Sequence, residues 1–217
     1  MSFDVMMRRS GVASEAVRAH IDLCRPSSAG RYAKGFGRRL PCGCMTLGGR
    51  RIVVLAEDGY EDLELWVPYY RLLEEGAEVV LAGHEKRIYS SKHSYPCEVE
   101  VAAADLKAKD FDAVVIPGGV AGPDKMRLHK EILRFVRSMN EGRKVVAAIC
   151  HAAWVPISAG IVKGRRMTSF ASVRDDCVNA GADWVDKDCV VDGNFITSRF
   201  PDDLPAFCRA IVSSLTK

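Results

Sequence analysis

Residues 145–154 read VVAAICHAAW, an apolar run of strand character that passes directly into a stretch of helical character. The pattern predicts a buried strand at 145–149 and a helix at 150–158 that stops at Gly160. The alanines on either side of Cys150 carry little side-chain bulk, which suits a tight bend. A thiol between the end of a strand and the start of a helix has the geometry of a nucleophile elbow.

The same strand-to-helix order occurs nearer the N-terminus. Residues 52–56 read as a short apolar strand, a helix follows over about 61–75 and stops at Gly76, and 78–82 reads as the next strand. Pro68 lacks the N–H group that an interior helical position donates, so we expect this helix to kink or restart there.

A further unit begins with the buried strand 113–116, which the turn Pro117-Gly118-Gly119 ends sharply. Apolar residues between 124 and 140 recur at mostly helical spacing, and Gly142 closes that predicted helix. The other expected elements are a small hairpin from extended pieces around Ile88 and 98–101, a helix near 173–180, a hairpin with its Asp-Gly turn at 192–194, and a closing helix over about 202–215.

This alternation of strands and helices predicts a mostly parallel sheet with helices on both faces. The best architecture for it is a flavodoxin-like, Rossmann-related α/β sandwich. A chain of 217 residues is long enough for one well-buried core and short for two domains with a linker, so we expect one α/β domain over 50–217.

Residues 1–49 differ from the rest, because they are rich in Arg, Gly, Ser and Pro and have little apolar periodicity. We interpret them as an N-terminal extension that is disordered or not native, with Met45 as the natural start. Two alternatives remain open: an arginine-rich targeting leader, or a small metal clip that uses Cys42 and Cys44.

The composition is that of an ordinary globular protein, with 48% hydrophobic and 27% charged residues. The net charge of +3 is small and the basic residues are scattered, so we expect a small-molecule or peptide substrate and no specific nucleic acid. No apolar stretch approaches the roughly eighteen residues that span a bilayer, so we expect no membrane association and a cytoplasmic location. In that reducing compartment the eight cysteines would mostly be thiols.

Ligands of such sheets bind at the carboxyl ends of the strands, which here carry the turns 57–61, 117–121 and 150–151. The N–H groups and dipole of the following helix would lower the pKa of Cys150 and make its thiolate a nucleophile. The alternative is that Cys150 only packs, since free cysteine is among the most buried residue types.

Three neighbours can support that chemistry. His151 can exchange a proton with the thiol, although adjacent helical residues face each other only in a distorted turn; otherwise it faces solvent or a subunit contact. Glu61 can share a proton with Cys150 if the site is desolvated, or it is merely a favourable partner of a helix dipole. The N–H groups of residues 118–120 (Gly118, Gly119 and Val120), with that of His151, can hold an oxyanion, or the turn only ends a strand.

We assign no metal site. The acids Glu57, Asp58, Asp62 and Glu64 have no histidine or cysteine at ligand spacing, which favours a solvated acidic turn. His20, His84, His93 and His129 also stand apart in the sequence and receive no role.

Several separated motifs in order resemble the PfpI/ThiJ family, a branch of the class I glutamine-amidotransferase-like superfamily. They are AEDGYEDLEL (56–65), PGG followed by Asp124, AICHAAWVPISAGIVKGR (148–165) and VRDDCVNAGADWVDKDCVVDGNFITSR (173–199). The resemblance covers roughly residue 51 to the C-terminus.

By this resemblance Cys150 is the nucleophile, His151 its partner and Glu61 the buried acid that tunes the thiol. Asp124 stands where an acid from a neighbouring subunit can orient the histidine, and it is shorter than the glutamate that the family often has. Phe170 replaces a tyrosine of some relatives and removes a hydroxyl donor. The resemblance also implies a homo-oligomer, a dimer, trimer or hexamer, with active sites near subunit contacts.

The leading functional hypothesis is an enzyme without metal or organic cofactor whose Cys150 thiolate attacks reactive carbonyls, a glyoxalase or protein deglycase that serves in stress protection. Its substrate would be a small aldehyde or a glycated protein. One alternative is an intracellular cysteine peptidase of the PfpI type. Another, from a different class, is a redox-sensing stress protein or chaperone whose Cys150 is oxidised without turnover. Fold alone does not choose among them.

Overall fold

The computed structural model describes residues 46–216. The predicted extension at 1–49, with Cys42, Cys44 and Met45, lies outside the described residues except for its last four. Of those four, Leu47 is fully buried, and its N–H donates to the carbonyl of Glu75 at 2.9 Å. The packed structure therefore includes residues before the predicted domain boundary at 50.

A seven-stranded sheet forms the centre of the structure, in the order β10-β11-β7-β6-β1-β2-β5. Every neighbouring pair is parallel except β10 with β11, which confirms the predicted mostly parallel sheet. The strands are β1 (Arg51–Leu55), β2 (Glu78–Gly83), β5 (Val101–Ala102), β6 (Ala113–Ile116), β7 (Val145–Ile149), β10 (Cys189–Asp192) and β11 (Phe195–Ser198).

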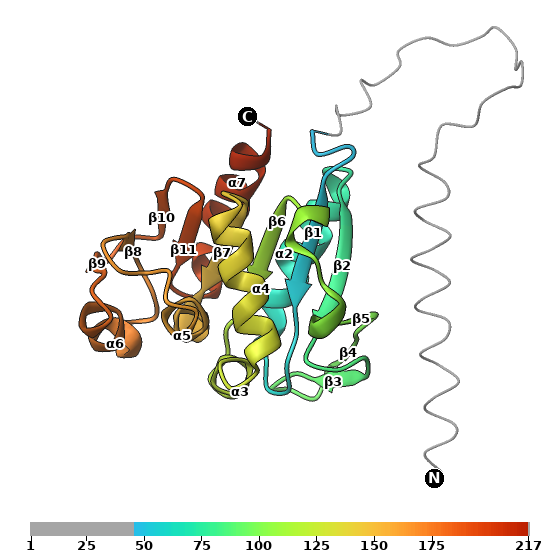
Figure 1. Cartoon of the computed structure of the whole chain (residues 1–217), viewed down its shortest axis with the longest axis horizontal. Helices are drawn as coiled ribbons and strands as arrows, with labels where there is room; N and C mark the ends of the chain where they lie inside the picture. The colour runs from blue at the N-terminus through green and yellow to red at the C-terminus, as the bar shows by residue number, and fades with distance from the viewer. Residues whose placement is uncertain (1–45, 217) are drawn as a thin grey trace, which may run out of the picture. The chain divides into compact units, whose positions relative to one another are not determined.

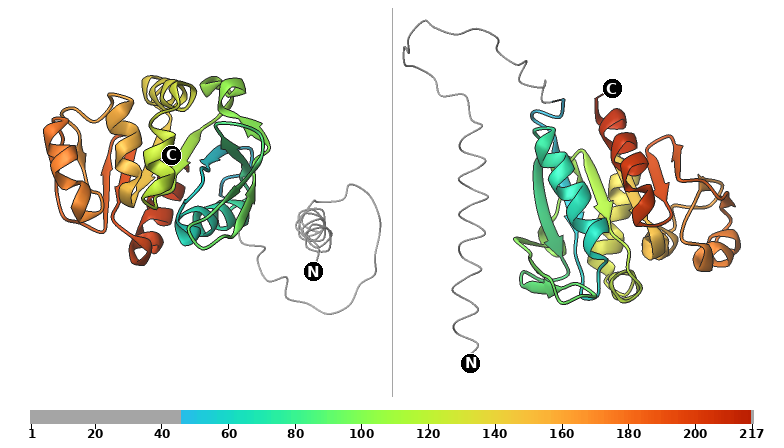
Figure 2. Two further views of the ribbon diagram at one scale, coloured as in Figure 1. Left: turned by 90° about the horizontal axis from the view of Figure 1, so that it is seen from below. Right: turned by 180° about the vertical axis from the view of Figure 1, so that it is seen from behind.

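Helices cover both faces of the sheet, as Figures 1 and 2 show. On one face lie α2 (Asp62–Glu74) and α7 (Leu204–Leu215), and on the other lie α3 (Ala121–Met126), α4 (Lys130–Glu141) and α5 (Trp154–Ser158), followed by α6 (Arg174–Asn179). Successive residues of a strand point to opposite faces, so Val53 belongs to one apolar cluster and Val54 to the other. The flavodoxin-like α/β sandwich is confirmed.

Two small pairs of strands lie beside this sheet. The hairpin β3 (Ile88–Ser90) with β4 (Pro96–Glu98) and the parallel pair β8 (Arg166–Met167) with β9 (Asp183–Trp184) are separate from it. Both predicted hairpins are present, but the second strand of the first is 96–98 and not 98–101, since Val101 belongs to β5 of the central sheet. The second hairpin has Gly193 in its turn at φ +60°. Five 3₁₀ turns complete the described elements: η1 (Ala103–Asp105), η2 (Ala108–Asp110), η3 (Cys150–Ala153), η4 (Ala171–Val173) and η5 (Pro201–Asp203).

Two helix predictions were wrong. The helix α2 does not restart at Pro68 but runs through it, because Pro68 is buried with Leu65 and Leu72 and its packing offsets the one hydrogen bond that proline cannot make. The helix predicted over 124–140 is two helices, because the backbone at His129 is extended (φ −91°, ψ 108°) and α4 starts after it.

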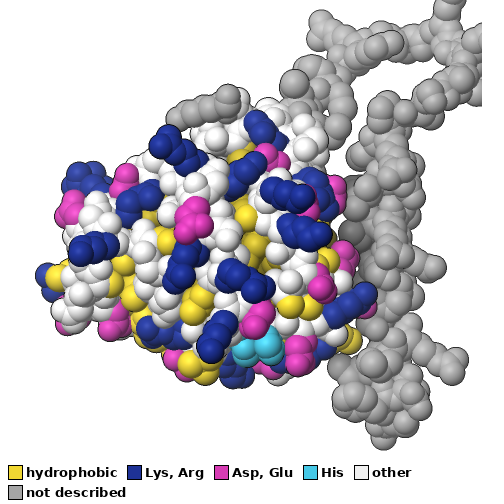
Figure 3. All heavy atoms as spheres, in the orientation of Figure 1, with side chains coloured by type: hydrophobic (Ala, Val, Ile, Leu, Met, Phe, Trp, Pro, Cys, Tyr) yellow, Lys and Arg dark blue, Asp and Glu magenta, His cyan; other side chains and the backbone are white. Residues whose placement is uncertain are grey.

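The distribution of charged side chains on the surface is consistent with the small net charge of +3. In Figure 3 Lys and Arg side chains are spread among Asp and Glu over the visible face and do not gather in one patch. Among the described residues, no helix is long and apolar enough to cross a membrane.

Candidate active site

Cys150 lies at the strand-to-helix turn that the sequence predicts. It follows β7 directly, begins η3, and has φ +64°, a left-handed conformation that costs a non-glycine residue about 1–2 kcal/mol. Ala148, Ala152 and Ala153 are all buried around it, so the bend closes without side-chain clashes. This backbone is the nucleophile-elbow geometry, and it holds a thiol that is only 8% exposed.

The strained turn also brings His151 to the thiol. Its Nδ1 lies 3.2 Å from Sγ of Cys150, which an ordinary helical turn does not allow for adjacent residues. The imidazole stacks on the ring of Phe170, with centroids 4.7 Å apart and an angle of 24° between the planes. Its other nitrogen, Nε2, lies 3.1 Å from Oγ of Ser172, a residue that the sequence analysis did not single out.

The acid at the thiol is Glu64 and not Glu61, which corrects the sequence-based assignment. Glu64 is fully buried, its Oε2 accepts the N–H of Gly118 at 2.9 Å, and its carboxyl and the Cys150 thiol influence each other's pKa. The carboxylate of Glu61 instead forms an ion pair with Lys92. Glu61 precedes the first turn of α2 in an extended conformation, so its side chain points to the loop at 91–95, whereas Glu64 lies on the buried face of the helix.

Burial is the largest influence on the pKa values of the titratable groups in this site. It raises the pKa of Glu64 to about 8, and the charge of Glu61 acts in the same direction. Burial also raises the pKa of the Cys150 thiol, as does a Glu64 carboxylate, while the N–H groups of His151 and Gly119 act in the opposite direction. The N–H groups at the start of the helix lower the thiol pKa, as expected, but the net shift is upward because desolvation is the larger effect.

The same burial lowers the pKa of His151. A neutral imidazole 3.2 Å from a neutral thiol can act as a base, so the geometry supports activation by proton transfer rather than a standing thiolate.

The predicted oxyanion turn is only partly available. The N–H of Gly118 already donates to Glu64, and its carbonyl accepts the N–H of Glu61 at 3.1 Å, so Gly118 cannot hold an oxyanion. The N–H of Gly119 faces the thiol together with that of His151. Val120 follows with an exposed side chain. Of the predicted oxyanion groups, those of Gly119 and His151 therefore act on the reactive sulfur.

Replacing Gly118 by alanine is expected to lower the free energy of unfolding by about 1–3 kcal/mol, as overpacking does. A Cβ there would lie 2.6 Å from Cβ of Cys150 and 2.8 Å from the carbonyl oxygen of Ile149, and it would also clash with the Glu64 carboxyl. Denaturant unfolding measures the loss. Gly142→Ala is the control, since its Cβ would come no closer than 3.3 Å to another atom; equal stability of the two variants would contradict the steric argument.

Asp124 is not in contact with His151. It lies on α3 with an exposed side chain, and its carboxylate makes no hydrogen bond or ion pair with any other residue between 46 and 216. Within one chain it therefore does not orient the imidazole.

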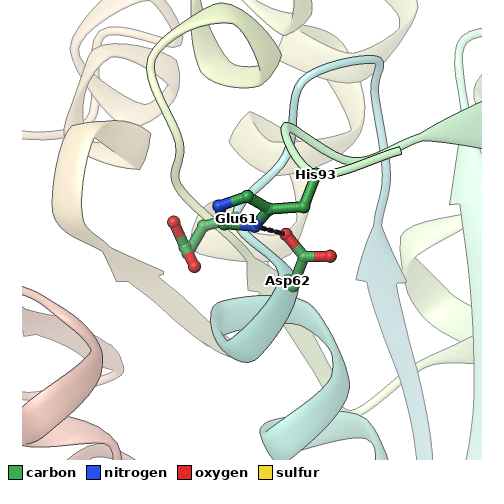
Figure 4. A group of neighbouring side chains, drawn as sticks. All are labelled: Glu61, Asp62 and His93. Carbon is green, nitrogen blue, oxygen red and sulfur yellow. Dashed lines mark hydrogen bonds and ion pairs between the residues drawn. The ribbon is translucent and has the colours of Figure 1, made fainter. Parts of the chain in front are cut away.

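The fold does bring a histidine to the acidic turn, contrary to the sequence analysis. Ligand atoms of Glu61, Asp62 and His93 lie within 4.8 Å of one another. Figure 4 shows these three side chains gathered at the start of α2. His93 Nδ1 is 2.8 Å from Oδ2 of Asp62, and Glu61 pairs with Lys92. The carboxylates of Asp62 and Glu61 thus have partners within the chain. The cluster fixes the loop at 91–95 against the start of α2.

Two more of the unassigned histidines meet in space. The rings of His84 and His129 stack with centroids 3.7 Å apart, and His129 Nε2 lies 3.5 Å from the buried carboxylate of Glu57. Nearly parallel rings do not direct their lone pairs at one point, so this pair is not arranged as a set of metal ligands.

Comparison with known proteins identifies the family of this chain. Residues 50–214 match the DJ-1/PfpI family. The chain is 44% identical over 165 residues to the Deglycase PfpI of Pyrococcus furiosus, covering 76% of this chain and 99% of that protein, and 38% identical over 167 residues to the Putative cysteine protease YraA of Bacillus subtilis, covering 76% and 98%. The crystal structure of Drosophila melanogaster DJ-1beta superposes with a TM-score of 0.73 at 30% identity, over 77% of this chain and 90% of that one. The chain belongs to the DJ-1/PfpI family.

Proposed function

We propose that the chain is a cysteine-dependent enzyme that acts on reactive carbonyls, as a glyoxalase or protein deglycase in stress protection. The observation that carries the proposal is the pairing of Cys150, on a strained turn, with His151 Nδ1 at 3.2 Å. The similarity to a relative named a deglycase supports the same chemistry.

The reaction on methylglyoxal can be written with these residues. The thiol gives its proton to Nδ1 of His151, and the thiolate adds to the aldehyde carbon while the N–H groups of Gly119 and His151 stabilise the oxyanion. The imidazolium of His151 returns its proton to the oxyanion, which gives a neutral thiohemiacetal and a free imidazole. His151 then removes the proton of the former aldehyde carbon and delivers it to the neighbouring carbon, while the hydroxyl proton passes to the neighbouring oxygen, which leaves a lactoyl thioester on Cys150. Water hydrolyses the thioester and releases lactate and the free thiol.

The narrow access to the thiol favours a small carbonyl over a peptide. Cys150 is 8% and His151 9% exposed, and an extended peptide backbone needs an open groove beside the nucleophile. Two surface hollows of the described residues lie elsewhere, one along α2 at Trp66 and Tyr70 and one at the β10–β11 turn. A cysteine peptidase remains the second candidate, supported by the relative named a putative cysteine protease.

The proposal includes an oligomeric state and a cellular location. A cytoplasmic homo-oligomer, a dimer, trimer or hexamer, would place the exposed Asp124 of one subunit near a site of its partner. A redox-sensing or chaperone role is the alternative from a different class, and oxidation of Cys150 by peroxide without any lactate formation would favour it.

The test is to incubate the purified protein with methylglyoxal, without glutathione or added metal, and to measure methylglyoxal loss and lactate formation. Stoichiometric lactate is expected. Absence of lactate, together with cleavage of a peptide library, would overturn the proposal in favour of the peptidase.

A further inference from the structure

Both ring nitrogens of His151 have a side-chain partner in the same chain. Nδ1 lies 3.2 Å from Sγ of Cys150, and Nε2 lies 3.1 Å from Oγ of Ser172. A thiol, an imidazole and a hydroxyl therefore form one continuous hydrogen-bonded series. In nucleophile–histidine pairs, a third group that orients the base is a recurring part of the machinery.

The position of Ser172 is fixed by the backbone around it. The N–H of Phe170 donates to the carbonyl of Cys150 at 3.3 Å, which ties this segment directly to the elbow. The 3₁₀ turn η4 then carries Ser172, and the N–H of Val173 donates to the carbonyl of Phe170 at 2.9 Å. The hydroxyl thus reaches Nε2 from a turn that is anchored at both ends.

Different contacts fix the orientation of the imidazole ring and its tautomer. Phe170 stacks on one side of the ring, and Trp154 packs edge-on with centroids 5.3 Å apart. These contacts set the orientation of the ring but do not choose which nitrogen carries the proton, because aromatic packing distinguishes the two nitrogens only weakly. A hydrogen bond at Nε2 makes that choice.

We propose that Ser172 is a positioning residue of this site: its Oγ accepts a hydrogen bond from Nε2–H of His151, so that the lone pair of Nδ1 faces the Cys150 thiol. The inference rests on the proposed role of Cys150 as the nucleophile. In the step it supports, the S–H bond of Cys150 breaks and an N–H bond forms at Nδ1, giving a thiolate and an imidazolium. Ser172 keeps the Nε2 proton throughout.

A serine hydroxyl can donate or accept, so the direction of the bond needs a second argument. Burial lowers the pKa of His151 and raises that of Cys150, and both shifts favour a neutral thiol beside a neutral imidazole. In that pair the thiol donates to Nδ1, so the ring proton is on Nε2 and faces Ser172. Within one chain Asp124 makes no contact with the ring, and among residues 46–216 Ser172 is the hydrogen-bond partner of Nε2.

The experiment compares Ser172→Ala with Ser172→Thr, which keeps the hydroxyl, and with the control Ser213→Ala on the exposed side of α7. The first readout is the rate of alkylation of Cys150 by iodoacetamide between pH 5 and pH 10, followed by mass spectrometry of the Cys150 peptide. The second is the ¹⁵N NMR spectrum of the His151 ring, which reports the tautomer. Neither readout requires turnover, so failure of the proposed enzymatic function and failure of this inference are distinguishable.

Loss of one hydrogen bond is expected to slow alkylation of Ser172→Ala at pH 7 by about threefold to tenfold and to shift its pH profile. The fraction of the Nε2–H tautomer should fall in the same variant. Ser172→Thr should stay within about twofold of the wild type, and Ser213→Ala should match it. An alkylation profile and tautomer in Ser172→Ala that match the wild type would overturn the inference, as would equal losses in the alanine and threonine variants.

Discussion

Replacing Cys150 by alanine is expected to lower kcat/KM for methylglyoxal by at least about a thousandfold, because the bond-forming atom itself is removed. His151 and the N–H of Gly119 would remain in place, but they have no nucleophile to activate. The rate of lactate formation under first-order conditions measures the loss.

The same variant should keep its fold, which makes the loss interpretable. Alanine retains the Cβ of the strained residue at φ +64°, so the backbone conformation costs the same as before. The melting temperature should change by no more than about 4 °C. Cys189→Ala, which removes a partly exposed thiol on β10, is the control and should keep full activity. Lactate formation that survives in Cys150→Ala, or that is lost in Cys189→Ala, would contradict the assignment.

The fold could be predicted from the sequence because its signals are local. Apolar runs such as 145–149 and turn signals such as Gly142 recur along the chain, and an alternating strand–helix order has few topological solutions. The failures concern packing. No local signal says that Pro68 is buried within a continuous helix, or that the backbone at His129 becomes extended and divides α3 from α4.

The candidate site was predictable only in part, for a related reason. Cys150 and His151 are adjacent in the sequence, so a strained turn was sufficient to join them. Ser172 reaches the imidazole from the segment after β8, and periodicity carries no information on such a contact. The burial that raises the pKa of Cys150 is also a property of the packed chain.

Glu64 did have a signal that the sequence analysis passed over. It shares a helix face with Leu65, Pro68 and Leu72, all of which are buried. An acid on the apolar face of an amphipathic helix is seldom fully buried without a specific partner, which distinguishes it from Glu61 just before the helix. The spacing of apolar residues therefore identifies the buried acid better than its distance from the helix start.

Glu64→Gln is expected to lower kcat/KM for methylglyoxal by about a hundredfold, while Glu61→Gln changes it by less than about threefold. A protonated Glu64 can give a proton to the thiolate that leaves when the thioester is hydrolysed, and glutamine cannot, although it still accepts the N–H of Gly118. Glu61 pairs with Lys92 and does not contact the sulfur. The reverse order of effects would restore the assignment made from the sequence.

Stability against pH gives an independent test, and its sign follows from the raised pKa of Glu64. Below pH 4.5 the carboxyl is protonated in both the folded and the unfolded chain and has no effect. Between about 4.5 and 8 only the unfolded chain ionises fully, so the wild type loses stability as the pH rises, and above 8 the difference is constant. Glu64→Gln removes this loss, and after the cost of burying its amide we expect a gain of about 1–3 kcal/mol at pH 7 that disappears near pH 4.

The pH dependence of Cys150 alkylation should also change in the Glu64→Gln variant. Once glutamine replaces Glu64, no carboxylate opposes the thiolate, so the midpoint of iodoacetamide alkylation against pH should fall by about one unit. Faster alkylation together with slower turnover is a combination that a merely distorted site does not produce, because distortion slows both. An unchanged midpoint in Glu64→Gln would mean that burial alone sets the thiol pKa, and the carboxyl would then serve only to hold Gly118.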